Sequence, residues 1–266
     1  MRFSPFTHHD ISILDELRPP DWTDIKVPFQ FYLSSDFCFP IKLTHEDKII
    51  GVGCSIIHDD VAWLGHIIVH PEFRNQGHGT SITKQLIKIA EDNKTSTLFL
   101  IATEMGAPVY SKLGFVTETE YLFYKDVVLK EKFVQSNNIV PFQEKYFDQL
   151  YVLDKKLSSE NRLSHLNEHC SSGFVYLEND RVLGFYLPNF GEGIILAEHP
   201  SAGFELLKLH LTKNDKVVFP IDNTSALQFM MENSFQYFRK AKRMRLGIKR
   251  AWIPSTIFNR IGGNLG

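Results

Sequence analysis

The sequence predicts an α/β protein built from two related halves, and three observations carry this prediction. Segments with the periodicity of strands alternate with segments that have the periodicity of helices. A polar stretch interrupts the chain near its middle, and short patterns recur in the same order on both sides of it. With 266 residues, the chain is long enough for two domains of roughly 130 residues each.

The helices and strands of the first half follow from the spacing of apolar residues. Residues 80–92 place Ile82, Leu86 and Ile89 at near-helical spacing, with polar side chains on the other face, which predicts an amphipathic helix. Two apolar, β-branched runs around a short polar turn predict a strand hairpin before it. The predicted elements are strands at 48–57 and 61–69, the helix at 80–92, a strand at 97–102, and a helix at 107–113.

The recurring patterns indicate a diverged internal duplication. No single match is decisive, but four matches in the same order favour duplication over chance. The spacing between partners shortens along the chain, so the second half has lost residues after its His-Pro pair. The paired features are Leu14-Asp15 with Leu153-Asp154, Gly51 with Gly184, His70-Pro71 with His199-Pro200, and Phe115 with Phe235.

Charged and polar residues thicken over residues 125–138, where apolar periodicity is weak. We therefore expect a domain boundary in this stretch. The expected domains are residues 1–128 and residues 138–266.

Bulk composition excludes several classes of function. Hydrophobic residues make up 43% of the chain and charged residues 23%, the net charge is −2, and the pI is about 6.6. Such a balance predicts no general attraction to nucleic acid or to an anionic membrane. The basic run at residues 239–245 is more simply a late strand with a solvated face. Three cysteines without CxxC spacing, and no apolar run of about eighteen residues, favour a cytoplasmic protein without a disulfide framework, a metal site or a membrane span.

The segment most suggestive of chemistry is a glycine-rich turn between the second predicted strand and the helix that follows. It contains Arg74, Gly77 and Gly79. Unpaired backbone N–H groups at a helix N-terminus form an anion site that suits a pyrophosphate, and glycine allows the phosphate to approach closely. A plain structural connection would have a similar sequence. The pattern is neither a P-loop nor a dinucleotide-binding fingerprint.

A family resemblance sharpens this interpretation. The pattern Val69-x-Pro71-x-Phe73-Arg74-x-Gln76-Gly77-x-Gly79 resembles motif A of the GNAT superfamily of N-acetyltransferases, Gln/Arg-x-x-Gly-x-Gly/Ala after a strand. Residues 103–115 resemble motif B of that family, and the second half resembles the degenerate second domain of tandem GNAT proteins. The resemblance implies two tandem α/β domains, each a mixed, mostly antiparallel sheet flanked by helices. It also implies a catalytic first domain and a second domain with a substrate-pocket or structural role.

The resemblance assigns residues to the cofactor and to the chemistry. Tyr110 occupies the position of the tyrosine that donates a proton to the departing CoA thiolate. The sequence departs from the usual motif B at Gly106, where Ala is common, and at Thr103, where Asn is common. The residues implied in binding acetyl-CoA or another acyl-CoA are Ile67, Ile68, Val69, Arg74, Asn75, Gln76, Gly77, His78, Gly79 and Thr80.

The general base is less defined by the sequence. His66 precedes the expected pantetheine-binding strand residues, so it is a candidate base, although strand alternation could equally turn it into the core. His70 and His78 flank the turn and are expected to be exposed. Direct attack by an amine in a ternary complex needs no covalent intermediate, so no cysteine is assigned as a nucleophile.

The sequence therefore predicts an acyl-CoA-dependent N-acyltransferase acting on an amine acceptor. A small-molecule amine is the expected partner, without nucleic acid, membrane or metal, in a monomer or homodimer. One alternative is an inactive acyl-CoA-binding sensor. Another is an interaction module in which the glycines only shape a turn.

Overall fold

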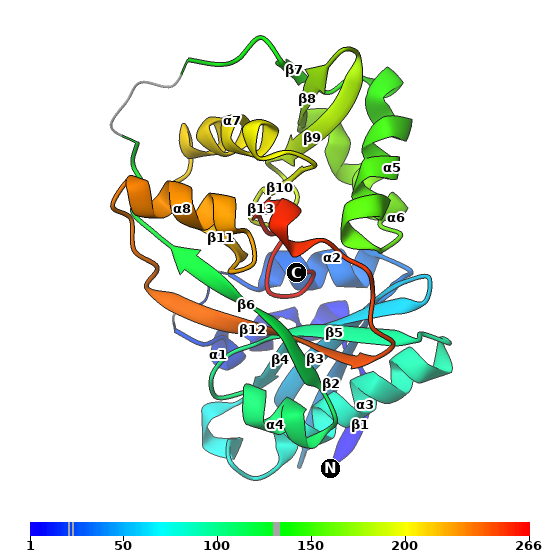
Figure 1. The fold of residues 1–266 in the computed structure, drawn as a ribbon. Coiled ribbons are helices and arrows are strands. Elements are labelled where there is room, and N and C mark those ends of the chain that lie inside the picture. The colour runs from blue at the N-terminus through cyan, green and yellow to red at the C-terminus, as the bar shows by residue number, and fades with distance from the viewer. Residues whose placement is uncertain (21, 23, 130–133) are drawn as a thin grey trace. The chain divides into compact units, whose positions relative to one another are not determined.

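The computed structural model describes residues 1–20, 22, 24–129 and 134–266 of the chain (Figure 1). Contacts divide the chain into two compact units. The expected domains 1–128 and 138–266 are each continuous in sequence. The compact units are not, because two segments from late in the chain belong to unit 1. Unit 1 comprises Met1–Val116, Met244–Lys249 and Gly263–Leu265, and unit 2 comprises Thr117–Arg243, Arg250–Gly262 and Gly266.

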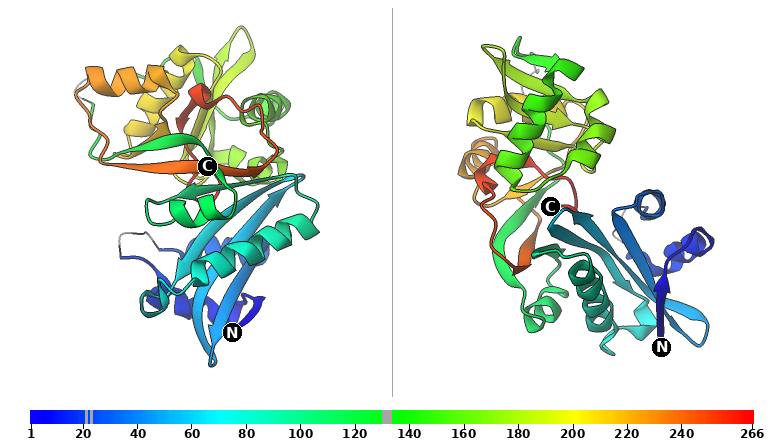
Figure 2. Two further views of the ribbon diagram at one scale, coloured as in Figure 1. Left: turned by 60° about the horizontal axis from the view of Figure 1, so that its bottom comes forward. Right: turned by 90° about the vertical axis from the view of Figure 1, so that its right-hand side faces the viewer.

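Unit 1 is built on a mixed sheet in the order β1-β2-β3-β4-β5, with the end of β12 (Arg239–Gly247) next in the order. Neighbours from β1 to β4 are antiparallel, and β4 and β5 are parallel. Helices α1 and α2 lie on one face and α3 lies on the other (Figure 2). The elements are β1 Arg2–Pro5, η1 His8–Ile13, α1 Leu14–Leu17, α2 Lys26–Ser34, β2 Cys38–His45, β3 Lys48–His58, β4 Val61–Val69, η2 Pro71–Phe73, α3 His78–Asp92, β5 Thr97–Ala102 and α4 Ala107–Lys112.

The predicted hairpin, helices and buried strand of the first half are confirmed. The buried face of α3 carries Ile82, Leu86 and Ala90, spaced four residues apart, and it packs on β3 and β4. Two glycines of β3 bring the helix close. A Cβ added at Gly51 would lie 2.7 Å from Ile82 Cδ1, and one at Gly53 would lie 2.9 Å from Leu86 Cδ1.

Unit 2 contains a second sheet, in the order β13-β10-β9-β8-β7, and the strands β12, β6 and β11 in neighbouring positions. Its largest core cluster joins side chains of β9, β10, α7, β11 and α8. Its elements are β6 Val116–Tyr124, of which Val116 belongs to unit 1, then β7 Ile139–Pro141, η3 Glu144–Tyr146, α5 Phe147–Ser158, α6 Leu163–His169, η4 Cys170–Ser172, β8 Phe174–Glu178, β9 Arg181–Leu187, β10 Ile194–Ala197, α7 Pro200–Leu211, β11 Val217–Pro220, α8 Thr224–Glu232, η5 Pro254–Thr256 and β13 Ile257–Asn259.

The local geometry of the two halves supports the internal duplication. A Cβ at Gly184 would meet Leu196 O and the α7 side chain of Leu206, as one at Gly51 would meet Ile68 O and the α3 side chain of Ile82. The turns after α4 and α8 also match. Phe115 N donates to Tyr110 O, and Phe235 N donates to Met230 O. Met230 is therefore the counterpart of Tyr110.

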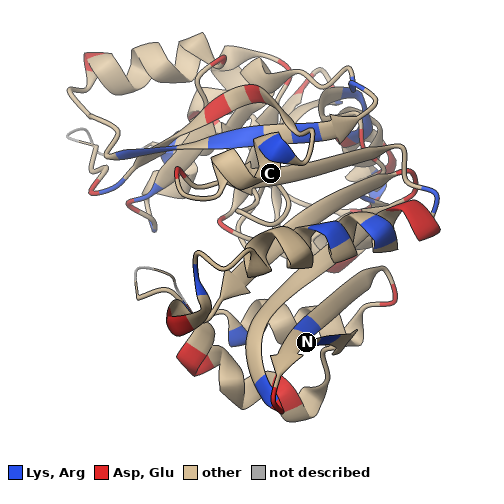
Figure 3. Ribbon diagram, turned by 90° about the horizontal axis from the view of Figure 1, so that it is seen from below, with Lys and Arg blue, Asp and Glu red and all other residues tan. Residues whose placement is uncertain are grey.

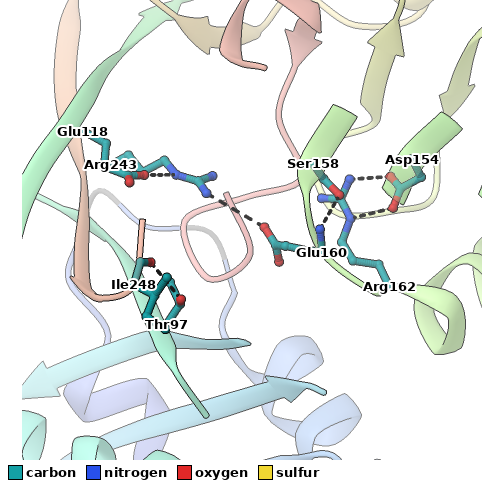
Figure 4. A network of polar contacts seen from close by, with 8 residues as sticks. All are labelled: Thr97, Glu118, Asp154, Ser158, Glu160, Arg162, Arg243 and Ile248. Atoms are coloured by element: carbon teal, nitrogen blue, oxygen red, sulfur yellow. Dashed lines mark hydrogen bonds and ion pairs between the residues drawn. The ribbon is translucent and has the colours of Figure 1, made fainter. Parts of the chain in front are cut away.

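The basic run forms strand β12, and two of its basic residues make ionic contacts with β6. Lys240 Nζ lies 3.0 Å from Glu120, and Arg243 Nε lies 3.2 Å from Glu118 (Figure 4). Opposite charges on neighbouring strands stabilise a sheet, so these two contacts give Lys240 and Arg243 a structural role. Acidic and basic residues are intermixed over the molecule (Figure 3).

A second buried ion pair lies in unit 2, where Arg162 bonds Asp154 through two nitrogens (Figure 4). Both side chains are at most 5% exposed. Because an unpaired buried charge is costly, each partner holds the other in the core. None of the helices in the described part of the chain has the length and hydrophobicity of a membrane span.

Candidate functional site

The strands β4 and β5 pair only at their beginnings. The parallel register joins Val61–Trp63 to Thr97–Phe99, and neither strand continues the pairing in the described chain. The second half of β4 therefore presents an edge that β5 does not cover. Backbone N–H and C=O groups on such an edge can bind an extended ligand as an additional strand would.

A β-bulge in β4 marks the start of this unpaired edge. The register with β3 shifts between Val52, which faces Ile68, and Cys54, which faces Gly65. His66 lies in the bulge with a φ of +50°, a left-handed conformation that is uncommon for histidine. Bulges of this kind redirect a side chain and are frequent beside active sites.

The glycine-rich turn forms an open cradle at the N-terminus of α3. Gly77 caps the helix with a φ of +85°, and the first helical bond runs from Ser81 N to Gly77 O. The N–H groups of the first turn therefore lack helical acceptors. A Cβ at Gly77 would meet nothing within 4 Å, and one at Gly79 would meet only Val69 Cγ2, at 3.9 Å. The space and the donors both suit an anion such as a phosphate.

Side chains of the turn tie it to the end of β4. Arg74 Nε donates to Val69 O at 3.1 Å, and Gln76 donates to Glu72 O at 3.2 Å. Arg74 thus holds the strand end and the turn together, with its terminal guanidinium nitrogens unbonded within the described residues. The structure therefore brings residues 67–69 and 74–80 into one continuous site.

The expectation that His70 and His78 are exposed is wrong. His70 accepts a bond from Glu72 N and its side chain is 12% exposed. His78 is 8% exposed because it begins α3 and packs beside Phe73, and its Nε2 is buried without a partner in the described chain. The side chain of His78 is therefore part of the packing between the turn and α3.

Tyr110 lies on α4. The two departures from motif B, Thr103 and Gly106, both have a structural role in the loop before this helix. Thr103 Oγ1 accepts a bond from Gly106 N at 3.2 Å, and Pro108 is in the first turn, where a missing N–H is harmless. The ring of Tyr110 rests against Gly106, whose Cβ would lie 2.9 Å from Tyr110 Cε2. Glycine at position 106 therefore makes room for the ring.

The hydroxyl of Tyr110 is available for chemistry. It has no hydrogen-bond partner among the described residues, while the ring packs edge-on to Phe115 with centroids 6.1 Å apart. Burial raises the pKa of Tyr110 to about 12, so the hydroxyl stays protonated at neutral pH. It is a hydrogen-bond and proton donor, as an acid must be.

His66 lies in an aromatic recess. Trp22, Phe29 and Tyr32 place their ring centroids 5.9, 5.7 and 5.7 Å from the imidazole. Burial lowers the pKa of His66 to about 4, so the ring is neutral at physiological pH. Its Nδ1 contacts the hydroxyl of Tyr32 at 2.8 Å.

The sequence did not predict the two residues that are linked to His66 by hydrogen bonds, which are Tyr32 directly and Asn264 through Tyr32. Tyr32 belongs to an aromatic-rich segment, but nothing in the sequence joins it to a residue of β4. Asn264 donates to Tyr32 Oη at 2.7 Å, and a Cβ at Gly65 would collide with Asn264 Cβ at 2.6 Å. The absence of a side chain at Gly65 is the only local signal of this close approach.

The lowered pKa of His66 predicts acid sensitivity. Its ordinary pKa of 6.5 applies to the unfolded chain, and its folded pKa is about 4. Between these values the unfolded state binds more protons, so stability is intact above pH 6.5 and falls as the pH drops toward 4. The His66→Gln protein has no such group, so we expect its free energy of unfolding to fall by up to about 3 kcal/mol less than that of the wild type over this pH range. Denaturant titrations of both proteins at pH 7.5 and pH 4.5 measure it, and parallel losses would contradict the assignment. The lowered pKa values of His169 and His210 affect both proteins equally.

Comparison with known proteins shows a family similarity for residues 9–115. The model of the acetyltransferase (GNAT) family matches residues 9–115. These residues are therefore similar to the acetyltransferase (GNAT) family. They include β4, the turn, α3 and Tyr110. No curated protein sequence matches the chain significantly.

Solved structures extend the likeness to the whole chain. An acetyltransferase candidate from Pyrococcus horikoshii has a TM-score of 0.84 at 22% identity, covering 100% of this chain and 95% of its own. A tandem GNAT protein from the clavulanic acid biosynthesis pathway has a TM-score of 0.61 at 12% identity, covering 92% and 98%. A GCN5-related N-acetyltransferase from Sphaerobacter thermophilus has a TM-score of 0.63 at 13% identity, covering 96% and 98%. The chain therefore has a tandem GNAT fold.

The described residues of unit 2 differ from those of unit 1 at the positions that correspond to this site. In unit 2, β13 pairs with the edge of β10 that corresponds to the open edge of β4. The segment of unit 2 that corresponds to the glycine-rich turn leads into α7, which begins at Pro200. Proline has no backbone N–H group to donate to a ligand. The carboxylate of Glu198 precedes it, and hydrogen bonding to Lys156 lowers the pKa of Glu198, so it stays negative. In unit 2, the chain itself thus covers the strand edge that is open in unit 1.

We expect one CoA per chain for this reason. Calorimetric titration with CoA should give a stoichiometry close to one. Gly77→Asp should lower the CoA affinity of that single site. Two sites per chain, or a site that survives Gly77→Asp unchanged, would show that unit 2 binds the cofactor.

Proposed function

We propose that unit 1 is an acyl-CoA-dependent N-acyltransferase, which transfers an acetyl or other acyl group to an amine. The single observation that carries this proposal is the open second half of β4, which leads directly into the glycine-rich cradle. An extended arm attached to a phosphate group fits this combination, with the arm along the strand edge and the phosphate at the helix. The family match over the same residues supports the choice of acyl-CoA.

The cofactor-binding residues divide into two groups. The strand segment proposed for the pantetheine arm is Ile67, Ile68 and Val69, in which Ile68 pairs with Val52 of β3 and the backbone groups of Ile67 and Val69 face the open edge. The turn offers backbone N–H groups and the Arg74 guanidinium to the pyrophosphate. The turn residues are Arg74, Asn75, Gln76, Gly77, His78, Gly79 and Thr80.

The reaction is direct aminolysis of the thioester. The amine nitrogen attacks the carbonyl carbon, and collapse of the tetrahedral intermediate releases the thiolate. Tyr110 donates to that sulfur from its protonated hydroxyl. His66 has one of two roles, a proton acceptor or a hydrogen-bond donor, according to which ring nitrogen carries the hydrogen. The cysteines are buried, and burial raises the pKa of Cys54 and Cys170, so neither is a good nucleophile.

The expected acceptor is a small-molecule amine, and the expected location is the cytoplasm. The mixed surface charge gives no reason to add a nucleic acid. Among the described residues, no three side chains of the metal-ligating types gather as a metal site would require.

The direct test is an amine panel incubated with acetyl-CoA, in which free thiol and acylated product are both measured. Transfer to at least one amine supports the proposal. Tight CoA binding without transfer or hydrolysis would instead indicate a sensor. Absence of CoA binding by calorimetry would indicate that the glycines only shape a turn.

A further inference from the structure

His66 is the end of a buried hydrogen-bond chain that begins outside the GNAT motifs. Asn264 Nδ2 donates to Tyr32 Oη at 2.7 Å, and Tyr32 Oη lies 2.8 Å from His66 Nδ1. Tyr32 is 1% exposed. The three residues come from α2, from β4 and from the late segment Gly263–Leu265, all within unit 1.

The chain fixes the direction of each hydrogen bond. A buried hydroxyl must donate its hydrogen, because an unmade buried bond is costly. The amide nitrogen of Asn264 is itself a donor and cannot accept. Among the described residues the remaining polar partner of the hydroxyl is His66 Nδ1, so Tyr32 donates to Nδ1. A neutral imidazole that accepts at Nδ1 carries its hydrogen at Nε2.

The ring remains in this neutral form under working conditions. With a pKa of about 4, only about one molecule in a thousand holds a protonated His66 at pH 7. Burial also raises the pKa of Tyr32 well above 10, so its hydroxyl always has a hydrogen to give. The Nε2–H group is unbonded within the described chain and is not among the buried unpaired atoms. It is therefore free to bond a substrate atom.

The backbone places His66 directly before the strand edge proposed for the acyl-CoA arm. His66 adopts its left-handed conformation in the bulge immediately before Ile67–Val69, the open edge of β4. Strained residues persist where the surrounding structure holds them, and they are frequent at active sites. Gly65 leaves the space in which Asn264 reaches Tyr32.

We propose that His66 is a neutral N–H donor to the thioester carbonyl oxygen, and that Tyr32 and Asn264 are the positioning residues that hold its hydrogen on Nε2. This inference rests on the proposed acyl transfer. As the amine forms its bond to the carbonyl carbon, the C=O electron pair moves to oxygen, where Nε2–H stabilises the negative charge. The C–S bond then breaks, and its electron pair leaves with sulfur, which takes a proton from Tyr110. The proton lost by the amine goes to water, which restores Tyr110.

Substitution of His66 separates donation from base catalysis. His66→Gln retains an amide N–H donor but has no basic nitrogen, whereas His66→Leu has neither. Loss of one donor to an oxyanion lowers kcat by about 100- to 1,000-fold. We expect that loss for His66→Leu and a loss of less than about tenfold for His66→Gln. Equal, large losses in both variants would overturn the donor role.

The positioning residues are tested by nitrogen-15 NMR of histidine-labelled protein. The His66 signal, identified by its absence from His66→Gln, should show the Nε2–H tautomer at pH 7. Asn264→Asp replaces the amide donor with an acceptor, which reverses the chain and moves the hydrogen of His66 to Nδ1. We expect kcat to fall at least tenfold while KM for acetyl-CoA is unchanged. An Nδ1–H tautomer in the wild-type protein, or a tautomer switch without a fall in kcat, would overturn the inference.

A matched control exists in unit 2. Asn138 Nδ2 donates to Tyr176 Oη at 2.9 Å, the same pair of groups as Asn264 and Tyr32. Asn138→Asp should leave kcat unchanged. Tyr32→Phe provides a second variant, which removes the hydroxyl and should lower kcat without the charge change.

If the wild-type protein transfers no acyl group at all, the proposed function fails before any variant is compared. Normal transfer that Asn264→Asp and Tyr32→Phe both leave intact defeats only the inference about His66.

Discussion

Tyr110→Phe is expected to lower kcat by about 100- to 10,000-fold, the usual contribution of a general acid, while acetyl-CoA binding and the melting temperature stay nearly unchanged. The ring packs against Gly106 and Phe115, and phenylalanine preserves those contacts. The hydroxyl has no hydrogen-bond partner among the described residues, so its removal breaks no bond within the protein. The loss should therefore appear in chemistry and not in stability.

The pH dependence of kcat gives an independent check on Tyr110. An acid must be protonated to act, and the pKa of this hydroxyl is raised to about 12 by burial. The wild-type rate should therefore show no alkaline fall from Tyr110 at pH 9 to 10. Tyr237→Phe, at an exposed tyrosine of unit 2, is the control and should behave as the wild type. A normal kcat with a lowered melting temperature in Tyr110→Phe would identify a structural tyrosine instead.

Gly77→Asp is expected to weaken CoA binding at least tenfold, about 1.4 kcal/mol. A Cβ at this position meets no atom within 4 Å, so the new side chain would enter the space proposed for the phosphate, and it would bring a negative charge. Calorimetric titration with CoA measures the loss, and circular dichroism checks the fold.

Gly77→Asn separates the effect of charge from that of volume. Asparagine and aspartate have nearly the same size, and both tolerate the left-handed conformation better than other residues with a side chain. Asn should weaken binding less than Asp, and the difference should shrink in high salt as the charge is screened. Equal CoA affinities in the wild type and in both variants would remove the phosphate assignment from this turn.

The sequence was informative wherever a structure depends on near neighbours. The hairpin of β3 and β4, the helix α3, the strand β5 and the helix α4 all follow from patterns shorter than about fifteen residues. The cradle followed for the same reason, because a strand, two glycines and a helix N-terminus are consecutive along the chain. The duplication was visible because both halves kept the glycines and aromatic residues that their packing requires.

The sequence did not predict contacts between residues that are far apart along the chain. His66 was found as a candidate, but its neutral state and its bond to Tyr32 depend on burial and on α2, thirty-four residues away. His78 was misjudged as exposed because its burial depends on packing with Phe73, not on the polar residues around it. The pairing of β13 with β10 gave no local signal, and the approach of Asn264 left only the glycine at position 65.

The repeated α/β pattern, the glycine-rich turn at Arg74–Thr80 and the candidate base His66 could all be recognised in the sequence, and the family resemblance added Tyr110. Tertiary structure alone decided that β4 diverges from β5 to leave an open edge, that β13 closes the corresponding edge of β10, and that Asn264 reaches Tyr32 past Gly65. The physical reason is the range of the interactions. Turns, helix starts and strand periodicity are set by sterics and hydrogen bonds among adjacent residues, whereas strand pairing, burial and the pKa of a buried imidazole are set by groups that meet only when the chain has folded.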